Sequence, residues 1–284
     1  MKCPNCDISL TYHKNKDIMR CHYCGYANKK INVCRECGSD ALKELGSGTE
    51  KIEEELKLLF PTARIIRMDL DTTSKKGAHE KIINAFSNGE YDILLGTQMI
   101  SKGLDFPNTT LVGVISADNS LFIPSYRSSE ATYDLLSQVA GRSGRSAKKG
   151  SVVIQTFNKE HYAITLAAKN DYETFYKLEM QERLLGKYPP YFYLTEVIMK
   201  GKDYEFMSKE VNKIKNLLVS KLPEKIIIGP SIMHPAKINN YYRFSIIVKY
   251  KKEFDLKDVL RDLINHYKAN NKIKIEVSFN PFDI

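Results

Sequence analysis

The stretch ILLGTQMISKGLDFPNTTLVGVISAD, from Ile93 to Asp118, decides the fold class. An apolar run rich in β-branched residues stands at each of its ends, and Gly96 and Thr97 close the first run. In open α/β folds, ligands bind at the carboxyl ends of the strands. The hydroxyl and backbone amide of Thr97 suit a nucleic-acid phosphate, so we expect this residue to bind DNA.

The loop that follows carries Lys102-Gly103-Leu104-Asp105. Its place after the same strand predicts that Lys102 contacts DNA and that Gly103 and Asp105 contact a bound nucleotide. The carboxylate of Asp105 can accept hydrogen bonds from a ribose or orient an arginine. An ordinary loop with a satisfied helix N-cap is the alternative for these residues.

Similar runs, ARIIRMD and GSVVIQTF, stand on either side, and helical patterns separate the runs at about 76–87 and 129–140. This alternation of strand and helix predicts a parallel α/β sheet. The segment GTEKIEEELKLLF has apolar residues at helical spacing before the first run. A long, mostly polar helix is expected over about 159–185.

A different pattern follows Pro189 and Pro190, which mark a domain boundary. The order βαββαβ predicts a ferredoxin-like domain there. The expected elements are a strand at 194–199, a helix at 204–220, strands at 226–228 and 242–250, a helix at 256–270 and a strand at 273–279. From Tyr188 onward, 17 Lys and Arg stand against 11 Asp and Glu, so most of the net positive charge lies in this domain.

The chain of 284 residues carries 43 Lys and Arg against 34 Asp and Glu, a formal net charge of +9. An excess of this size suits a partner that carries phosphates. No apolar run approaches the roughly 20 residues that cross a bilayer, and the N-terminus has no hydrophobic signal stretch. We therefore expect a cytoplasmic protein that makes no membrane contact.

Six cysteines, all before residue 40, form three C-x-x-C pairs. This spacing lets two sulfurs face one tetrahedral ion from a tight turn, and it predicts zinc ligands. Six thiolates complete one four-cysteine site and leave a pair over, which His13, His22 or ligands outside the sequence would have to complete. A redox couple or buried apolar packing is the alternative. The predicted metal ligands are Cys3, Cys6, Cys21, Cys24, Cys34 and Cys37.

The octamer QVAGRSGR, Gln138 to Arg145, sets Arg142 and Arg145 three residues apart after a helical pattern. Guanidinium groups bind phosphate oxygens in a paired, planar geometry. The sequence holds no G-x-x-x-x-G-K-[ST] run, so the phosphates have to be held by another surface. Alone, two such arginines are typical of a solvated helix end. Together with the loop after Thr97 they indicate a nucleotide sensor.

Two of these segments resemble known motifs. LLGTQMISKGLDFP is similar to motif V and QVAGRSGR to motif VI of superfamily 2 helicases, both in the second RecA-like lobe. The longer run SADNSLFIPSYRSSEATYDLLSQVAGRSGR, the run RMDLDTTSKKG and the cysteine pairs narrow the resemblance to the PriA family of primosomal replication-restart helicases. It implies a zinc-binding module at 1–45, a RecA-like helicase C-terminal lobe at 46–187 and a C-terminal DNA- or partner-binding domain at 188–284.

The resemblance implies an ATP-dependent 3′–5′ DNA helicase that restarts stalled replication forks and loads the primosome. ATP and Mg²⁺ would lie between two lobes. The lobe with the Walker A lysine is expected outside this sequence, so we do not expect ATPase activity from this chain alone. Arg145 is implied as the arginine finger, Arg142 as a second γ-phosphate contact and Gln138 as part of the interlobe network.

The resemblance also implies metal pairing and partners. The family's C-x-x-C pairs imply one zinc site formed by the first four cysteines, and a second that Cys34 and Cys37 would share with a pair before Met1. The implied partners are branched or single-stranded DNA, single-stranded DNA-binding protein and other primosome proteins.

Two other functions fit parts of the sequence. One is a zinc-containing fragment that binds DNA forks or partners without catalysis, with Lys237, Tyr241, Tyr242 and Arg243 of KINNYYRF pairing phosphates and stacking bases. An exposed hairpin with ordinary core tyrosines is the alternative for those four residues. The other is an aspartyl-phosphate phosphatase, since Asp69-Leu70-Asp71-Thr72-Thr73 imitates its D-x-D nucleophile loop.

Overall fold

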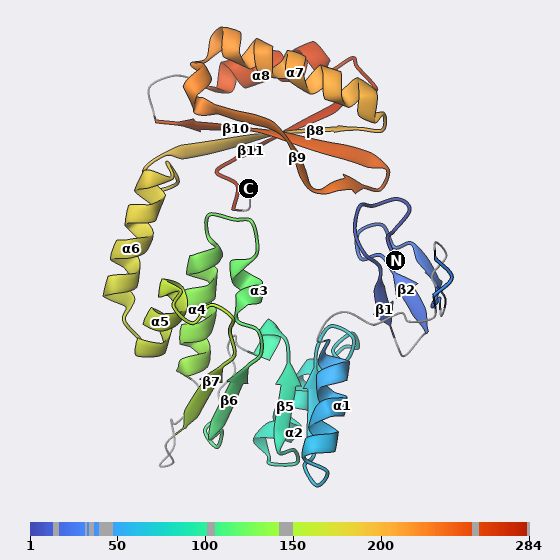
Figure 1. The fold of residues 1–284 in the computed structure, drawn as a ribbon, viewed down its shortest axis with the longest axis vertical. Coiled ribbons are helices and arrows are strands. Elements are labelled where there is room, and N and C mark those ends of the chain that lie inside the picture. Colours follow the sequence, from blue (N-terminus) through green and yellow to red (C-terminus); the bar gives the residue numbers. More distant parts are fainter. Residues whose placement is uncertain are drawn as a thin grey trace. The chain divides into compact units, whose positions relative to one another are not determined.

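The structure is a computed structural model, and it describes residues 1–13, 17–31, 33, 37–39, 48–100, 106–141, 150–251 and 256–282 (Figure 1). The chain forms two compact units. One combines Met1–Leu42 with Met180–Ile284, and the other is Lys43–Glu179. The division into three domains at residues 45 and 187 stays a prediction. No helix in the described ranges is both long and apolar enough to cross a membrane.

The N-terminal module is a small antiparallel sheet that surrounds cysteines. Its strands β1 (Thr11–His13), β2 (Ile18–Arg20) and β3 (Ala27–Lys29) pair in the order β1-β2-β3. The buried core consists of three cysteines and Leu10. So few apolar side chains bury little surface, and a fold of this size normally needs a metal or disulfides.

The second unit alternates strands and helices, as the sequence predicts. Strands β4 and β5 form one parallel pair, and β6 and β7 form another. A core of aromatic and aliphatic side chains joins α4, α5 and α6 and includes Tyr133, Leu136, Ala163 and Phe175. The elements are α1 (Thr49–Leu59), β4 (Ile65–Met68), α2 (Ala78–Ser87), β5 (Ile93–Gly96), the 3₁₀ turn η2 (Gln98–Ile100), β6 (Leu111–Val114), α3 (Asp118–Leu121), α4 (Ser128–Ala140), β7 (Ser151–Ile154) and α5 (Tyr162–Lys169).

The single helix expected over 159–185 is wrong, because the chain forms two helices there, α5 and α6 (Tyr172–Leu185). Asn170 ends α5 in the left-handed conformation, with φ of 53°. Asn tolerates this region better than other non-glycine residues. Asp171 then accepts a hydrogen bond from the backbone N–H of Thr174 at 3.1 Å and starts the next helix.

The C-terminal domain is the predicted βαββαβ unit. Its antiparallel sheet has the order β11-β8-β10-β9, and α7 and α8 cover one face (Figure 1). The edge strand β9 is longer than the strand expected at 226–228. It passes through Pro230 and Pro235, which an edge strand accommodates. The elements are β8 (Tyr193–Gly201), α7 (Tyr204–Lys221), the 3₁₀ turn η3 (Glu224–Ile226), β9 (Ile227–Ile238), β10 (Tyr241–Tyr250), α8 (Leu256–Tyr267) and β11 (Lys274–Phe279).

Candidate functional site

A cluster of four cysteines lies inside the N-terminal module. The sulfur atoms of Cys3, Cys6, Cys21 and Cys24 all lie within 4.8 Å of one another. Four Zn–S bonds of about 2.3 Å in a tetrahedron place the sulfurs about 3.8 Å apart. The Sγ atoms of Cys3 and Cys24 are 3.6 Å apart, so the cluster fits a zinc ion. The structure thus brings together the four cysteines that were predicted to share one site.

The backbone of the second C-x-x-C knuckle, Cys21 to Cys24, turns tightly around its sulfurs. The N–H of Gly25 donates to the carbonyl of Cys21 at 3.0 Å, and Gly25 has a φ of 76°, which favours glycine. Cys37 is exposed, and Cys34 lies outside the described residues. The second predicted zinc site therefore stays a prediction.

The thiols of Cys6 and Cys24 do not ionise with equal ease. Burial raises the pKa of the Cys6 thiol to about 12, whereas the backbone N–H of Tyr26 lowers the pKa of Cys24 to about 7. Zinc binds thiolates, so the ion has to displace protons from sulfurs such as that of Cys6. A bound metal is the means by which this module can hold four thiolates together.

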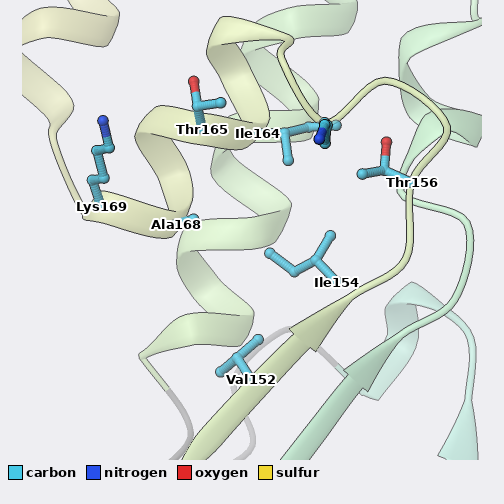
Figure 2. A pocket seen from close by; sticks show the side chains of 8 residues that line it. Val152, Ile154, Thr156, Ile164, Thr165, Ala168 and Lys169 are labelled. Carbon is cyan, nitrogen blue, oxygen red and sulfur yellow. The ribbon is translucent and has the colours of Figure 1, made fainter.

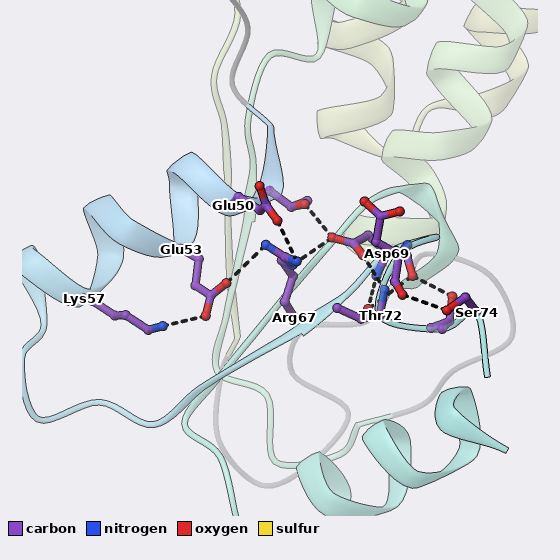
Figure 3. A network of polar contacts seen from close by, with 10 residues as sticks. Glu50, Glu53, Lys57, Arg67, Asp69, Thr72 and Ser74 are labelled. Carbon is purple, nitrogen blue, oxygen red and sulfur yellow. Dashed lines mark hydrogen bonds and ion pairs between the residues drawn. The ribbon is translucent and has the colours of Figure 1, made fainter. Parts of the chain in front are cut away.

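A polar network lies beside α1 in the second unit (Figure 3). Asp69 accepts hydrogen bonds from the backbone N–H groups of Asp71 and Thr72, at 3.1 and 2.9 Å, and from the Thr49 hydroxyl at 2.6 Å. The Arg67 guanidinium forms an ion pair with Asp69 at 2.8 Å. Burial raises the pKa of Asp69, but the hydrogen bonds from Thr49 and Thr72 and the charge of Arg67 lower it overall.

Asp69 therefore stabilises a turn and does not present an oxygen to a phosphoester, which argues against the phosphatase hypothesis. Arg67 also pairs with Glu50 at 3.3 Å and Glu53 at 3.4 Å, which joins β4 to α1. Its side chain is only 11% exposed. The motif RMDLDTT thus positions the first helix of this unit.

The structure places only some of the predicted nucleotide and DNA residues. Thr97 is exposed directly after β5, and its carbonyl accepts the N–H of Ile100 at 3.1 Å. Before it, a Cβ on Gly96 would lie 2.5 Å from the Met68 carbonyl, so the strand end requires glycine. Gln138 is exposed in the last turn of α4. The described residues do not include Lys102, Gly103, Asp105, Arg142 and Arg145.

The C-terminal sheet carries a row of cations on the face away from its helices. Lys274 lies opposite Lys200, and Lys200 lies opposite Arg243, on three adjacent strands. Their neighbours Met199 and Phe244 point into the helix-covered core, so the row occupies the other face. The Nζ atoms of Lys202 and Lys274 lie 5.5 and 5.3 Å from the centre of the Tyr241 ring.

Like charges directly opposite one another destabilise a sheet. Glu276 offsets part of the charge through a 2.6 Å ion pair with Lys200. An anion bound over this row would relieve the remaining repulsion. Sequence reasoning found Tyr241 and Arg243 but missed Lys200, Lys202 and Lys274, because the register that brings them together is visible only once the strands pair.

The residues predicted to bind DNA on this domain also have internal partners, and the Arg243 guanidinium donates to the Pro235 carbonyl at 3.3 Å. The Lys237 ammonium donates to the carbonyl of Pro4 at 3.0 Å. The ring of Tyr242 packs edge-on against Tyr204, with 5.3 Å between ring centres. Lys237 and Tyr242 thus contribute to packing within the unit, and their contact with DNA stays a prediction.

A mainly apolar pocket of about 400 Å³ lies between β7 and α5 (Figure 2). None of its described lining residues is a cysteine, histidine or carboxylate, so these residues do not form a metal site, and the ionisable groups among them are Lys159 and Lys169. The lining residues are Val152, Ile154, Thr156, Lys159, Ile164, Thr165, Ala168 and Lys169.

Three family models match this chain in succession. The PriA DNA helicase Cys-rich region domain matches residues 3–29, the helicase conserved C-terminal domain matches 45–147, and the primosomal protein N C-terminal domain matches 185–282. The first match contains all four clustered cysteines. The second contains the loops after Thr97 and Gln138.

Curated relatives match over almost the whole chain. Replication restart protein PriA of Bacillus subtilis (strain 168) is 47% identical over 99% of this chain and 35% of the relative. The protein of the same name from Synechocystis is 41% identical over 88% of this chain and 31% of the relative. The chain thus spans about a third of the length of these relatives. Among solved structures, the C-terminal domain of the DEAD-box protein Dbp5 matches 49% of this chain and 77% of its own length at 20% identity, with a TM-score of 0.29, which is too low to support an argument.

We predict that the zinc site depends on the clustered cysteines alone. Cys21→Ser should remove the bound zinc and unfold the N-terminal module, because the buried sulfur is one of four ligands. Metal content by mass spectrometry and the dispersion of amide resonances would measure both effects. Cys37→Ser is the control and should retain zinc at the four-cysteine cluster. Full zinc content in Cys21→Ser would contradict the assignment.

We predict that Arg67→Met destabilises the second unit by about 2–4 kcal/mol, because it leaves partly buried carboxylates without their cation. Lys57→Met is the control. It removes an ion pair with the same Glu53 at 2.6 Å, but the lysine side chain is 58% exposed, so the loss should be much smaller. Urea unfolding of the wild type and both variants would test this. An unfolding midpoint of Arg67→Met equal to that of the wild type would show that the network adds no stability.

Proposed function

Because the chain belongs to the PriA family, we propose that it forms the C-terminal part of an ATP-dependent DNA helicase that acts in replication restart. The order of the three matched domains along the chain carries this proposal. The four-cysteine cluster, the α/β unit and the βαββαβ domain fall in the same order. We place the protein in the cytoplasm, where the chromosome of a bacterium is replicated.

In this proposal ATP and Mg²⁺ lie between two lobes, of which Lys43–Glu179 forms one. The sequence holds no G-x-x-x-x-G-K-[ST] run, so the phosphate-binding loop belongs to the opposite lobe. Arg145 would act as the arginine finger and Arg142 as a second γ-phosphate contact. Gln138, exposed at the end of α4, would bind in the network between the lobes.

The loop after β5 would contact both the bound nucleotide and the DNA. Thr97 is exposed at the carboxyl end of the strand, where ligands bind in α/β folds. We assign Thr97 and Lys102 to the DNA backbone, and Gly103 and Asp105 to the nucleotide. Single-stranded DNA-binding protein and other primosome proteins are proposed as partners from family membership alone.

A second candidate function is DNA binding without catalysis, and the cation row on the C-terminal sheet favours it. Lys274, Lys200 and Arg243 could neutralise successive phosphates, while Tyr241 offers a ring on which a base can stack. We propose this surface, in place of Lys237 and Tyr242, as the contact for single-stranded DNA on this domain.

The arginine assignment predicts loss of ATP hydrolysis without loss of DNA binding. In a protein that includes the nucleotide-binding lobe, Arg145→Ala should lower DNA-stimulated ATP hydrolysis by about 10³- to 10⁵-fold, the usual contribution of an arginine finger. Fork binding, followed by fluorescence anisotropy, should change little. Turnover close to that of the wild type would refute the role of Arg145.

The cation row predicts a change in salt dependence. Lys274→Gln should weaken binding of single-stranded DNA and reduce the slope of log affinity against log salt by about 0.7, the value for one lost phosphate contact. Lys268→Gln, which follows α8 on the other side of the domain, is the matched control. If both variants bind DNA with the same affinity and slope, the row does not contact DNA.

A further inference from the structure

The C-terminal domain contacts the cysteine cluster directly. The backbone N–H of Asn239, between β9 and β10, donates to the sulfur of Cys6 at 3.2 Å. The two residues are 233 positions apart in the sequence. Ile238, in the same turn, packs against the buried cysteines. A ligand of the metal site is therefore hydrogen-bonded to another domain.

Further hydrogen bonds join the same two segments. The N–H of Asn240 donates to the carbonyl of Asn5 at 2.8 Å, and the N–H of Asp7 donates to the carbonyl of Lys237 at 2.8 Å. The Lys237 ammonium donates to the Pro4 carbonyl at 3.0 Å. The first C-x-x-C knuckle, Cys3 to Cys6, and the residue after it are thus bonded to the turn between β9 and β10. We call this segment the β9–β10 turn (237–241).

The geometry of this turn explains why its amides are available. Asn239 and Asn240 both have positive φ, 49° and 64°, and Ile238 pairs with Tyr241. Two central residues in the left-handed region form a type I′ hairpin turn, in which their own N–H groups are not needed for the strand ladder. Both groups point outward, and both donate to the first knuckle.

The strength of the hydrogen bond from Asn239 to Cys6 depends on whether the sulfur is a neutral thiol or a metal-bound thiolate. Hydrogen bonds to an ionised acceptor are about twice as strong as those between neutral groups. A zinc ion with four thiolates has a formal negative charge, and donors around such a site stabilise the metal-bound form. The turn therefore binds the metal-loaded knuckle more tightly than the metal-free knuckle.

We propose that the β9–β10 turn is an outer part of the metal centre, so that metal binding and docking of the N-terminal module on the C-terminal domain stabilise each other. Linkage requires the effect to run both ways. The turn raises the affinity for metal, and the metal holds the module on the domain. This inference does not depend on the proposed helicase function.

A first experiment replaces zinc with ¹¹³Cd in the full chain and records through-bond correlations between the metal and amide protons. The Asn239 amide should correlate with ¹¹³Cd through the sulfur of Cys6. The Tyr26 amide, which hydrogen-bonds to Cys24 inside the module, is the internal control. A signal from Tyr26 without one from Asn239 would overturn the proposal.

A second experiment changes residues of the β9–β10 turn and measures the affinity of the chain for zinc. Asn239→Ala with Asn240→Ala strains the two left-handed positions, whereas Asn239→Gly with Asn240→Gly keeps both amides without strain. The alanine pair should weaken zinc affinity by about 10-fold or more, a typical effect of losing an outer-shell partner. The glycine pair should stay close to the wild type. Equal zinc affinities of the alanine pair and the glycine pair, measured by competition with a chelator, would contradict the linkage.

A third experiment tests the reverse direction and does not require a variant to fold. Removal of zinc by a chelator should speed hydrogen exchange at the amides of Asp7, Asn239 and Asn240 by at least 10-fold. The Asn280 amide, which donates to Leu194 at 2.7 Å within the C-terminal domain, is the control and should not change. Unchanged protection at Asp7 and the turn would show that docking is independent of the metal.

Discussion

Four cysteine sulfurs lie within 4.8 Å of one another in the N-terminal module, and three of these cysteines make up most of its buried core. Beyond the cysteines, its buried core in the described residues consists of Leu10. Such a core cannot balance an ordering cost of about 1–2 kcal/mol per residue. A metal ion bound by the four thiolates supplies the missing free energy, because the site exists only in the folded module. The strands β1 to β3 and the contact with the β9–β10 turn depend on that ion.

The α/β unit is stabilised by an apolar core, and among the described residues one face of its β6–β7 strand pair is exposed. Val114 and Ile154, on one face of the β6–β7 pair, pack against the core beneath α4 and α5. Leu111 and Val153, on the other face, are 61% and 60% exposed. Parallel strands are normally covered on both faces. Among the described residues, this face therefore leaves apolar side chains for a further protein surface to cover.

The sequence predicted those features that a short-range rule controls. C-x-x-C spacing fixes two sulfurs around one ion, and the patterns after Pro190 fixed the order βαββαβ. Features that depend on one residue's conformation or on strand register were missed. Asn170 splits the expected long helix because its left-handed φ cannot be recognised from composition. The row of Lys274, Lys200 and Arg243 comes from residues far apart in the chain, which only the paired strands bring together.

Lysines of the C-terminal domain show why net charge alone does not identify a binding surface. The Lys249 ammonium donates to the Gly186 carbonyl at 2.7 Å and lies 3.6 Å from the centre of the Tyr188 ring, and burial lowers its pKa. Lys237 is likewise bonded to Pro4. Both count toward the positive charge of the domain, yet both hold neighbouring segments in place. Register, in contrast, places Lys274, Lys200 and Arg243 side by side on the face of the sheet away from its helices, and their mutual repulsion favours an anion near them.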